Sequence, residues 1–77
     1  MTDLDLVLRL AARWPAEMDV HHIGFLAGVE TRLLGLLSGT DAISRWAGLL
    51  MVLDKHGTGG MERAIRLTLI RLVETGT

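Results

Sequence analysis

The stretch that decides the fold is residues 18–39, MDVHHIGFLAGVETRLLGLLSG. Apolar residues recur through it at helical spacing, and we expect one long helix over 19–38. Asp19 is a suitable N-cap, and Gly39 has the position of a glycine that ends a helix. An alternative start places Pro15 in the first helical position and moves the boundary by about four residues. The expected buried face comprises Ile23, Leu26, Val29, Leu33, Leu36 and Leu37.

A stripe of small residues follows the same predicted helix. Its members are Gly24, Gly28, Thr31 and Gly35. A glycine inside a helix costs roughly 1 kcal/mol relative to alanine, so three of them need a compensating contact. Close approach of another helix is the natural compensation, as in the GxxxG contacts of membrane helices. We therefore predict a closely packed helix on this stripe, belonging either to the same chain or to a second copy in a homodimer.

Three further segments have helical periodicity, over 3–14, 41–56 and 60–75. Thr2 or Asp3 is expected to cap the first of them, and Thr40 the second, directly after Gly39. The expected buried residues are Leu4, Val7, Leu8, Ala11 and Trp14 in the first, widened by Leu6 and Leu10, then Ile43, Trp46, Ala47, Leu50 and Leu53 in the second, and Met61, Ala64, Ile65, Thr68, Leu69 and Leu72 in the third. No segment alternates as a strand does. The sequence predicts an all-α fold, a small bundle of four helices.

The length of the chain bears on its assembly. It has 77 residues, 49% of them hydrophobic, and no cysteine. A chain this short is marginally stable alone, and oligomerisation is a common remedy, so we predict a single domain over 1–77 completed by homodimerisation. The absence of cysteine fits a cytoplasmic location. Gly57, Gly59 and Gly60 are predicted to form a hinge, from which the last helix packs either on its own chain or on another.

Metal-binding and catalytic constellations are absent from the pattern. His21 and His22 are adjacent and therefore point about 100° apart on a helix, so they do not share one ion simply. The glycine-rich segment over 55–63 lacks the GK[ST] ending of a phosphate-binding loop. No nucleophile stands in a recognisable catalytic motif. We predict a protein that is not an enzyme and uses no metal or other cofactor.

The last predicted helix carries two large aliphatic residues on a charged face. These are Leu67 and Ile70, and the arginines around them are Arg63, Arg66 and Arg71. Single exposed aliphatics are normal on a protein surface, but aliphatics rimmed by arginine are also typical of interfaces. We predict that this face binds another protein. The chain would then be a small intracellular interaction module, an adaptor or an inhibitor, that acts through apolar helix surfaces.

Two other functions are weaker alternatives. A helical DNA-binding regulator needs a basic surface, whereas the net charge is −1 and the predicted helix over 41–56 offers only Ser44, Arg45 and Lys55 to DNA. A peripheral membrane protein is suggested by the high hydrophobic content. The longest apolar run covers 46–53, far short of the roughly 20 residues that a spanning helix needs.

Overall fold

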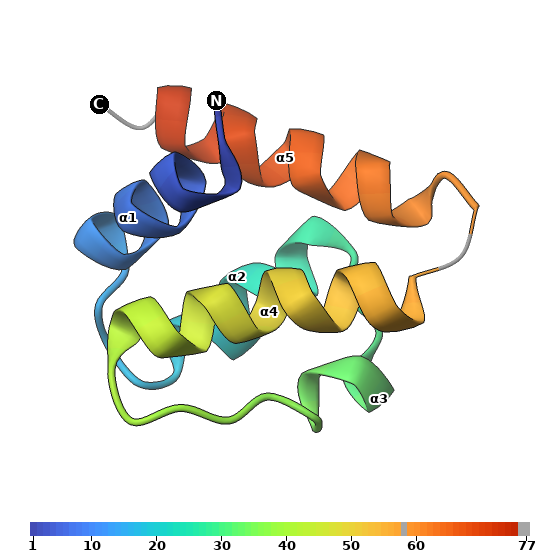
Figure 1. Cartoon of the computed structure of the whole chain (residues 1–77), viewed down its shortest axis with the longest axis horizontal. Coiled ribbons are helices and arrows are strands. Elements are labelled where there is room, and N and C mark those ends of the chain that lie inside the picture. The colour runs from blue at the N-terminus through green and yellow to red at the C-terminus, as the bar shows by residue number, and fades with distance from the viewer. Residues whose placement is uncertain (58, 76–77) are drawn as a thin grey trace.

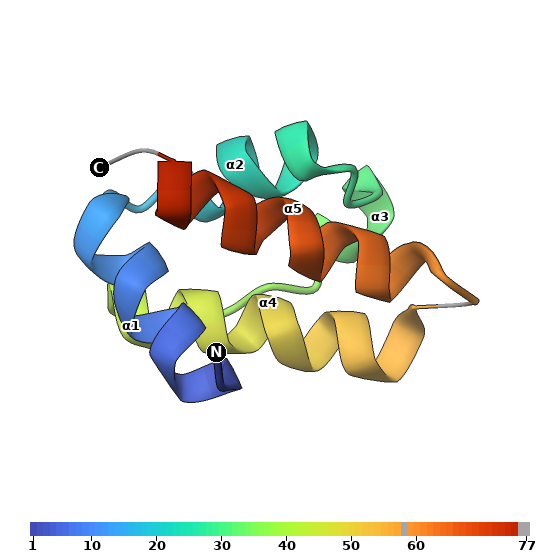
Figure 2. The ribbon, with the colours of Figure 1, turned by 90° about the horizontal axis from the view of Figure 1, so that it is seen from above.

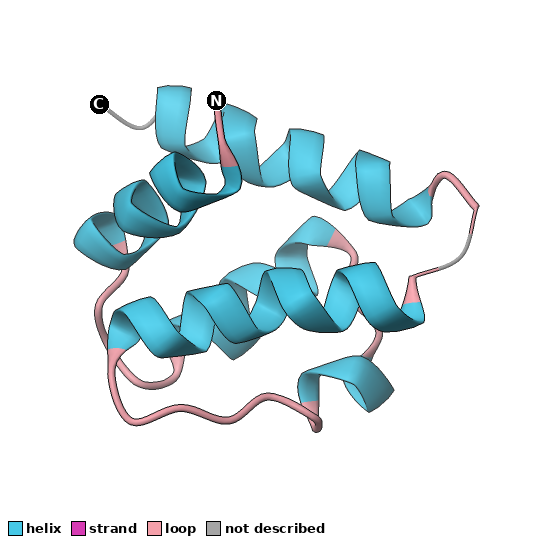
Figure 3. Ribbon diagram, viewed as in Figure 1, coloured by secondary structure: helices cyan, strands magenta, loops and turns pink. Residues whose placement is uncertain are grey.

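The computed structural model describes residues 1–57 and 59–75, and this part of the chain contains five α-helices and no strand. They are α1 (Asp3–Arg13), α2 (Asp19–Ala27), α3 (Thr31–Leu34), α4 (Ala42–His56) and α5 (Met61–Thr75). Figure 1 shows their arrangement, and Figure 3 shows that loops join them without any sheet. The all-α prediction is confirmed, but the predicted set of four helices is wrong in its second member.

The helix predicted over 19–38 is broken at Gly28. This residue has φ +106°, a left-handed conformation that favours glycine, and its N–H group bonds to the carbonyl oxygens of Gly24 and Phe25. Glu30 is extended at φ −61° and ψ 141°, and the single turn of α3 follows. Gly28 is therefore the helix-ending glycine, a role that we expected of Gly39. Residues 35–41 form a loop, so Gly39 and Thr40 do not join two helices directly, contrary to our expectation.

The break changes which leucines are buried. Val29, Leu33 and Leu34 are in the core, as is Gly24. Leu26 and Leu36 were expected to share that buried face, but they are 74% and 51% exposed. A continuous helix would keep residues of one face together, whereas a chain that turns at Gly28 presents its two halves to the core from different directions.

Side chains cap the first and fourth helices. Thr2 Oγ1 accepts a hydrogen bond from the Asp5 N–H at 3.1 Å, as predicted. Asp41, not Thr40, caps α4, because its Oδ1 accepts from the Ser44 N–H at 2.7 Å. That hydrogen bond lowers the pKa of Asp41 below its usual value of 3.8.

The helices enclose one core. Figure 2 shows α1 and α4 toward one side of the molecule and α2 with α3 toward the other, with α5 crossing the view between them, and Figure 1 shows α5 along the top of the molecule. The buried apolar residues are Leu6, Val7, Leu10, Ala11, Val20, Val29, Leu33, Leu34, Trp46, Leu49, Leu50, Leu53, Ile65, Leu69 and Val73. Trp46 is the largest of the fully buried side chains. None of the helices in the described residues is both long and apolar enough to cross a membrane.

The buried faces of α1 and α4 match the predicted ones only in part. In α1 the core side is Leu6, Val7, Leu10 and Ala11, because this helix packs against both α4 and α5. Leu4 and Leu8, which we expected to be buried, are exposed. In α4, Ile43 is likewise half exposed. In α5, Ile65 and Leu69 are buried as expected, whereas Ala64 is exposed.

Candidate functional site

Arg66 is the centre of an ion-pair cluster that joins three helices. Its guanidinium contacts Asp3 of α1 at 2.6 Å, Asp54 of α4 at 2.7 Å and Glu62 of α5 at 2.9 Å. Partial burial alone would lower the pKa of Arg66, yet the hydrogen bonds to Glu62 and Asp54 and the charge of Asp3 raise it above its ordinary value. In turn, the hydrogen bond from Arg66 lowers the pKa of Asp54 below 3.8. Arg66 is thus engaged within the chain, although it was predicted at a partner's rim.

The other residues of the predicted partner face divide between surface and core. Leu67 is 48% exposed, and Arg63 and Arg71 are exposed beside it on α5. Ile70 is partly buried and packs against the core. The exposed part of this face is therefore smaller than the sequence suggested, because Arg66 and Ile70 are drawn toward their own chain. Partner binding by this face stays a prediction.

The predicted glycine stripe does not lie on one helix, which corrects that prediction. Gly24 is buried in α2, and a Cβ placed there would lie 3.0 Å from Leu34 Cδ2 and 3.9 Å from Leu49 Cδ2. Its close neighbours are therefore α3 and α4 of the same chain. Gly28 ends α2, and Thr31 and Gly35 belong to the separate turn of α3.

The predicted hinge contains a tightly packed residue. A Cβ on Gly57 would lie 2.5 Å from the carbonyl oxygen of Leu53 and 2.9 Å from Glu62 Cβ, so only glycine fits there. Gly59 has φ +59°, and a Cβ on Gly59 or Gly60 would meet nothing within 4 Å. Thr58 lies outside the described residues. Hinge motion at these glycines stays a prediction.

A groove with apolar walls runs between α1 and α4. The two helices run in opposite directions. Asp3 at the start of α1 shares Arg66 with Asp54 near the end of α4, and Ala12 near the end of α1 lines one hollow with Ala42 at the start of α4. One hollow of about 260 Å³ is lined by Asp3, Leu4, Val7, Ile43, Ala47, Leu50, Met51 and Asp54. A second, of about 390 Å³, is lined by Leu8, Ala11, Ala12, Asp41, Ala42 and Ile43. Ile43 belongs to both hollows, so together they form one surface, which we call the α1–α4 groove.

The α1–α4 groove combines exposed apolar side chains with acidic ends. Leu4 and Met51 are 66% and 70% exposed. The charged residues that line the groove are Asp3, Asp41 and Asp54, and no basic residue of the described chain lines either hollow. Sequence reasoning missed this site because it placed Leu4 and Ile43 in the core. The sequence did contain a signal for this surface, because each of the two helices carries more apolar residues than one buried face can take.

A third apolar hollow, of about 410 Å³, lies on α2 and α3. Its lining residues are Met18, His21, His22, Phe25, Thr31, Leu34 and Gly35. Thr31 and Gly35 come from the predicted dimer stripe, so the structure brings two of those four residues to a surface with the exposed Phe25 and Met18. Nearby, Arg32 pairs with Glu30 at 3.2 Å. We call this surface the α2–α3 hollow.

Within the described residues, no cluster of three or more His, Cys, Asp or Glu side chains has the arrangement of a metal site. The chain matches no protein-family model, and comparisons with curated proteins and with solved structures found no match. The geometry of its surfaces is therefore what supports a function.

Proposed function

We propose that this protein is a non-enzymatic interaction module that binds an amphipathic helix of a partner protein in the α1–α4 groove. The observation that supports the proposal is the exposure of Leu4, Ile43 and Met51 along two antiparallel helices. A helix lays apolar side chains spaced three and four residues apart into such a groove. Exposed apolar surface of this kind marks interaction sites in soluble proteins.

The charge of the α1–α4 groove favours a partner helix with basic ends. The groove is acidic at both ends, since Asp3 and Asp54 lie at one end and Asp41 at the other. The cluster of Asp3, Asp54, Glu62 and Arg66 carries a net charge of −2, from three carboxylates and one guanidinium. A partner helix flanked by lysine or arginine complements this field and is steered toward it. A second copy would instead bring the same acidic ends together, so this groove does not suit self-association.

Homodimerisation is proposed at the other face, the α2–α3 hollow. Its nearby ion pair, Glu30 with Arg32, has both signs, so two copies related by a twofold axis can place opposite charges together. Phe25 supplies the aromatic anchor that interfaces favour. One face would then join two copies while the opposite face stays free for the partner. Light scattering at rising concentration tests this: we expect a dimer that Phe25→Asp converts to a monomer, and a monomer for the unaltered chain contradicts it.

The partner proposal is tested with a designed peptide. The probe is a fluorescent helical peptide with leucines three and four residues apart and lysines at both ends. The control peptide has glutamates in place of the lysines. We expect anisotropy to rise with the lysine peptide and not with the glutamate peptide. Added salt should weaken the binding, because the acidic ends contribute to it.

Variants locate the binding surface. Met51→Asp is expected to abolish binding while circular dichroism stays unchanged, because Met51 is exposed. Leu26→Asp, at an equally exposed apolar residue on α2, is the matched control and should bind as before. If Leu67→Asp lost binding and Met51→Asp did not, the partner would bind the face on α5 and not the groove. The DNA-binding and membrane alternatives are tested by repeating the binding measurement and its salt dependence with a DNA duplex or with anionic vesicles in place of the peptide.

A further inference from the structure

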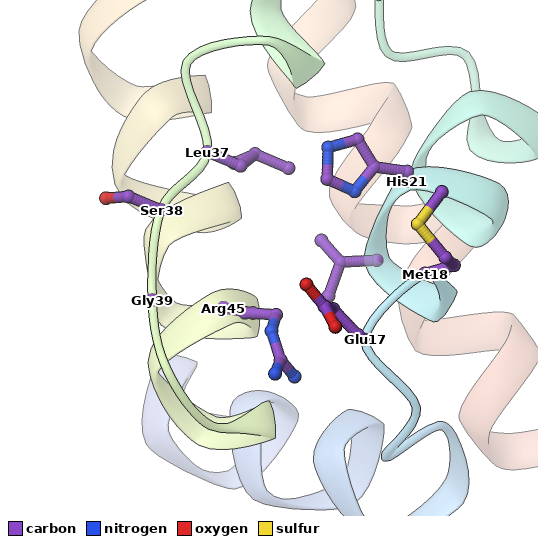
Figure 4. Close-up of a pocket in the computed structure, with 8 residues that line it drawn as sticks. Glu17, Met18, His21, Leu37, Ser38, Gly39 and Arg45 are labelled. Atoms are coloured by element: carbon purple, nitrogen blue, oxygen red, sulfur yellow. The ribbon is translucent and has the colours of Figure 1, made fainter.

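A small pocket lies between the start of α2, the loop that follows α3, and α4. Its volume is about 120 Å³, and it is lined by Glu17, Met18, Val20, His21, Leu37, Ser38, Gly39 and Arg45. Figure 4 shows His21 and Leu37 facing each other across it, while the Ser38 hydroxyl points away. The polar side chains that the pocket offers to a ligand are thus a carboxylate, a guanidinium and an imidazole.

These three groups are not satisfied by one another. No ion pair joins Glu17 to Arg45 in the described part of the chain, although both line the same pocket. Arg45 donates from Nη2 to the carbonyl oxygen of Thr40 at 3.2 Å, which uses one of its five N–H donors. His21 Nδ1 is buried and has no hydrogen-bond partner among the described residues. Buried polar atoms are normally hydrogen-bonded, so each exception needs an explanation.

We propose that this pocket binds a small zwitterion of the amino-acid class, with its ammonium group on Glu17 and its carboxylate on Arg45. A simple anion would be repelled by Glu17, and a simple cation by Arg45. A molecule that carries both charges pairs with both side chains through charge-assisted hydrogen bonds. The imidazole of His21 then forms a hydrogen bond with the ligand through Nδ1, as donor or acceptor according to its tautomer.

The volume sets the size of the ligand. An engineered cavity of about 150 Å³ in another protein holds benzene, so a pocket of about 120 Å³ fits five or six heavy atoms. Glycine and β-alanine have this size. The pocket is separate from the α1–α4 groove, and the proposal does not depend on the partner helix. Because the ligand would join α2 to the loop over 35–41, its binding should also stabilise the folded chain.

The test is an NMR titration of the full chain, labelled with ¹⁵N. Glycine and β-alanine are the probes, and acetate and methylammonium are the single-charge controls. We expect saturable shifts of the amide signals of Met18, His21, Ser38 and Arg45, with a dissociation constant on the order of 1 mM for at least one zwitterion. Neither control should give saturable shifts. The absence of saturable shifts with both zwitterions would overturn the proposal, and so would acetate binding as tightly as glycine.

Charge-neutral variants assign the two ends of the ligand. Glu17→Gln and Arg45→Gln should each weaken zwitterion binding at least about tenfold, since each removes one charge-assisted contact. Glu17→Gln should also allow acetate to bind, because the repelling carboxylate is gone. Arg32→Gln, whose ion pair with Glu30 lies outside the pocket, is the matched control and should bind as before. If Arg45→Gln does not fold, Glu17→Gln decides alone: unchanged zwitterion affinity in that variant overturns the assignment.

Discussion

The indole Nε1 of Trp46 donates a hydrogen bond to the backbone carbonyl oxygen of Trp14 at 3.1 Å, and the two rings lie 6.2 Å apart between centroids. The bond ties the first half of α4 to the end of α1, where Pro15 follows and the helix stops. The bond is partly buried, so loss of the donor leaves the Trp14 carbonyl without its partner where water has limited access. We expect Trp46→Phe to lower the free energy of unfolding by about 2 kcal/mol, measured by urea denaturation.

The control for that change is Trp14→Phe. This variant keeps the accepting carbonyl and removes only part of a half-buried ring, which Arg13 covers at 5.1 Å. We expect a loss below about 1 kcal/mol. Equal losses in the two variants would mean that ring packing, and not the hydrogen bond, accounts for the effect.

Alanine substitutions separate the roles of the glycines in the former stripe. Gly28 has φ +106°, so Gly28→Ala should cost about 1–2 kcal/mol of stability. Gly35 has φ −67°, and a Cβ there meets nothing closer than 3.5 Å, so Gly35→Ala should raise stability by about 0.4–1 kcal/mol. Thermal unfolding of both variants is the measurement. Destabilisation by both, to the same degree, would instead fit one continuous helix packed along all its glycines.

The Arg66 cluster should contribute measurably to stability. Its three carboxylates are partly or well exposed to solvent, so each pair is worth less than a buried one. We expect Arg66→Gln to cost about 1–2 kcal/mol in urea unfolding, because three pairs are lost and three carboxylates repel each other. Arg63→Gln, one turn away on the exposed side of α5, should change stability by less than about 0.5 kcal/mol. A loss that does not shrink in high salt would argue against an electrostatic origin.

Asp54 should make stability depend on acid. Its pKa in the folded chain is lowered from 3.8 by the hydrogen bond from Arg66, so the folded state favours the ionised form. The stabilisation is therefore complete well above pH 3.8 and is lost as the pH falls through the lowered folded-state value. Melting temperatures measured from neutral to strongly acidic pH should fall less steeply for Asp54→Asn than for the parent. An unchanged slope in Asp54→Asn would contradict this prediction.

Local sequence rules identified most of the helical residues. Thr2 as a cap, the periodicity of residues 3–14, 41–56 and 60–75, and the burial of Trp46, Leu53 and Leu69 follow from spacing and capping chemistry. These features depend on residues within a few positions of one another. They can therefore be predicted from the sequence without knowing which helix packs on which.

The errors have one physical source. Contacts between residues far apart in the sequence decide which glycine ends a helix and which face of a helix is buried. Gly28 and Gly39 are both suited to end a helix, and only the packing of Leu34 and Leu49 around Gly24 selects the earlier break. Leu4 and Leu6 are both expected on the buried side of the first helix, and only the positions of α4 and α5 decide that Leu6 alone is buried. The candidate sites were missed for the same reason, since the α1–α4 groove joins residues about 40 positions apart and the zwitterion pocket joins Glu17 to Arg45.

The packing of α1 has a consequence for how the chain acquires its structure during synthesis. α1 is made first, yet its buried face is covered by α4 and α5, which are made last. Until residues 61–75 have been translated, Leu6 and Leu10 lack their full set of core neighbours. Folding of this core must therefore wait for nearly all of the described chain, and of the five helices α1 is the one whose apolar face waits longest for its core neighbours.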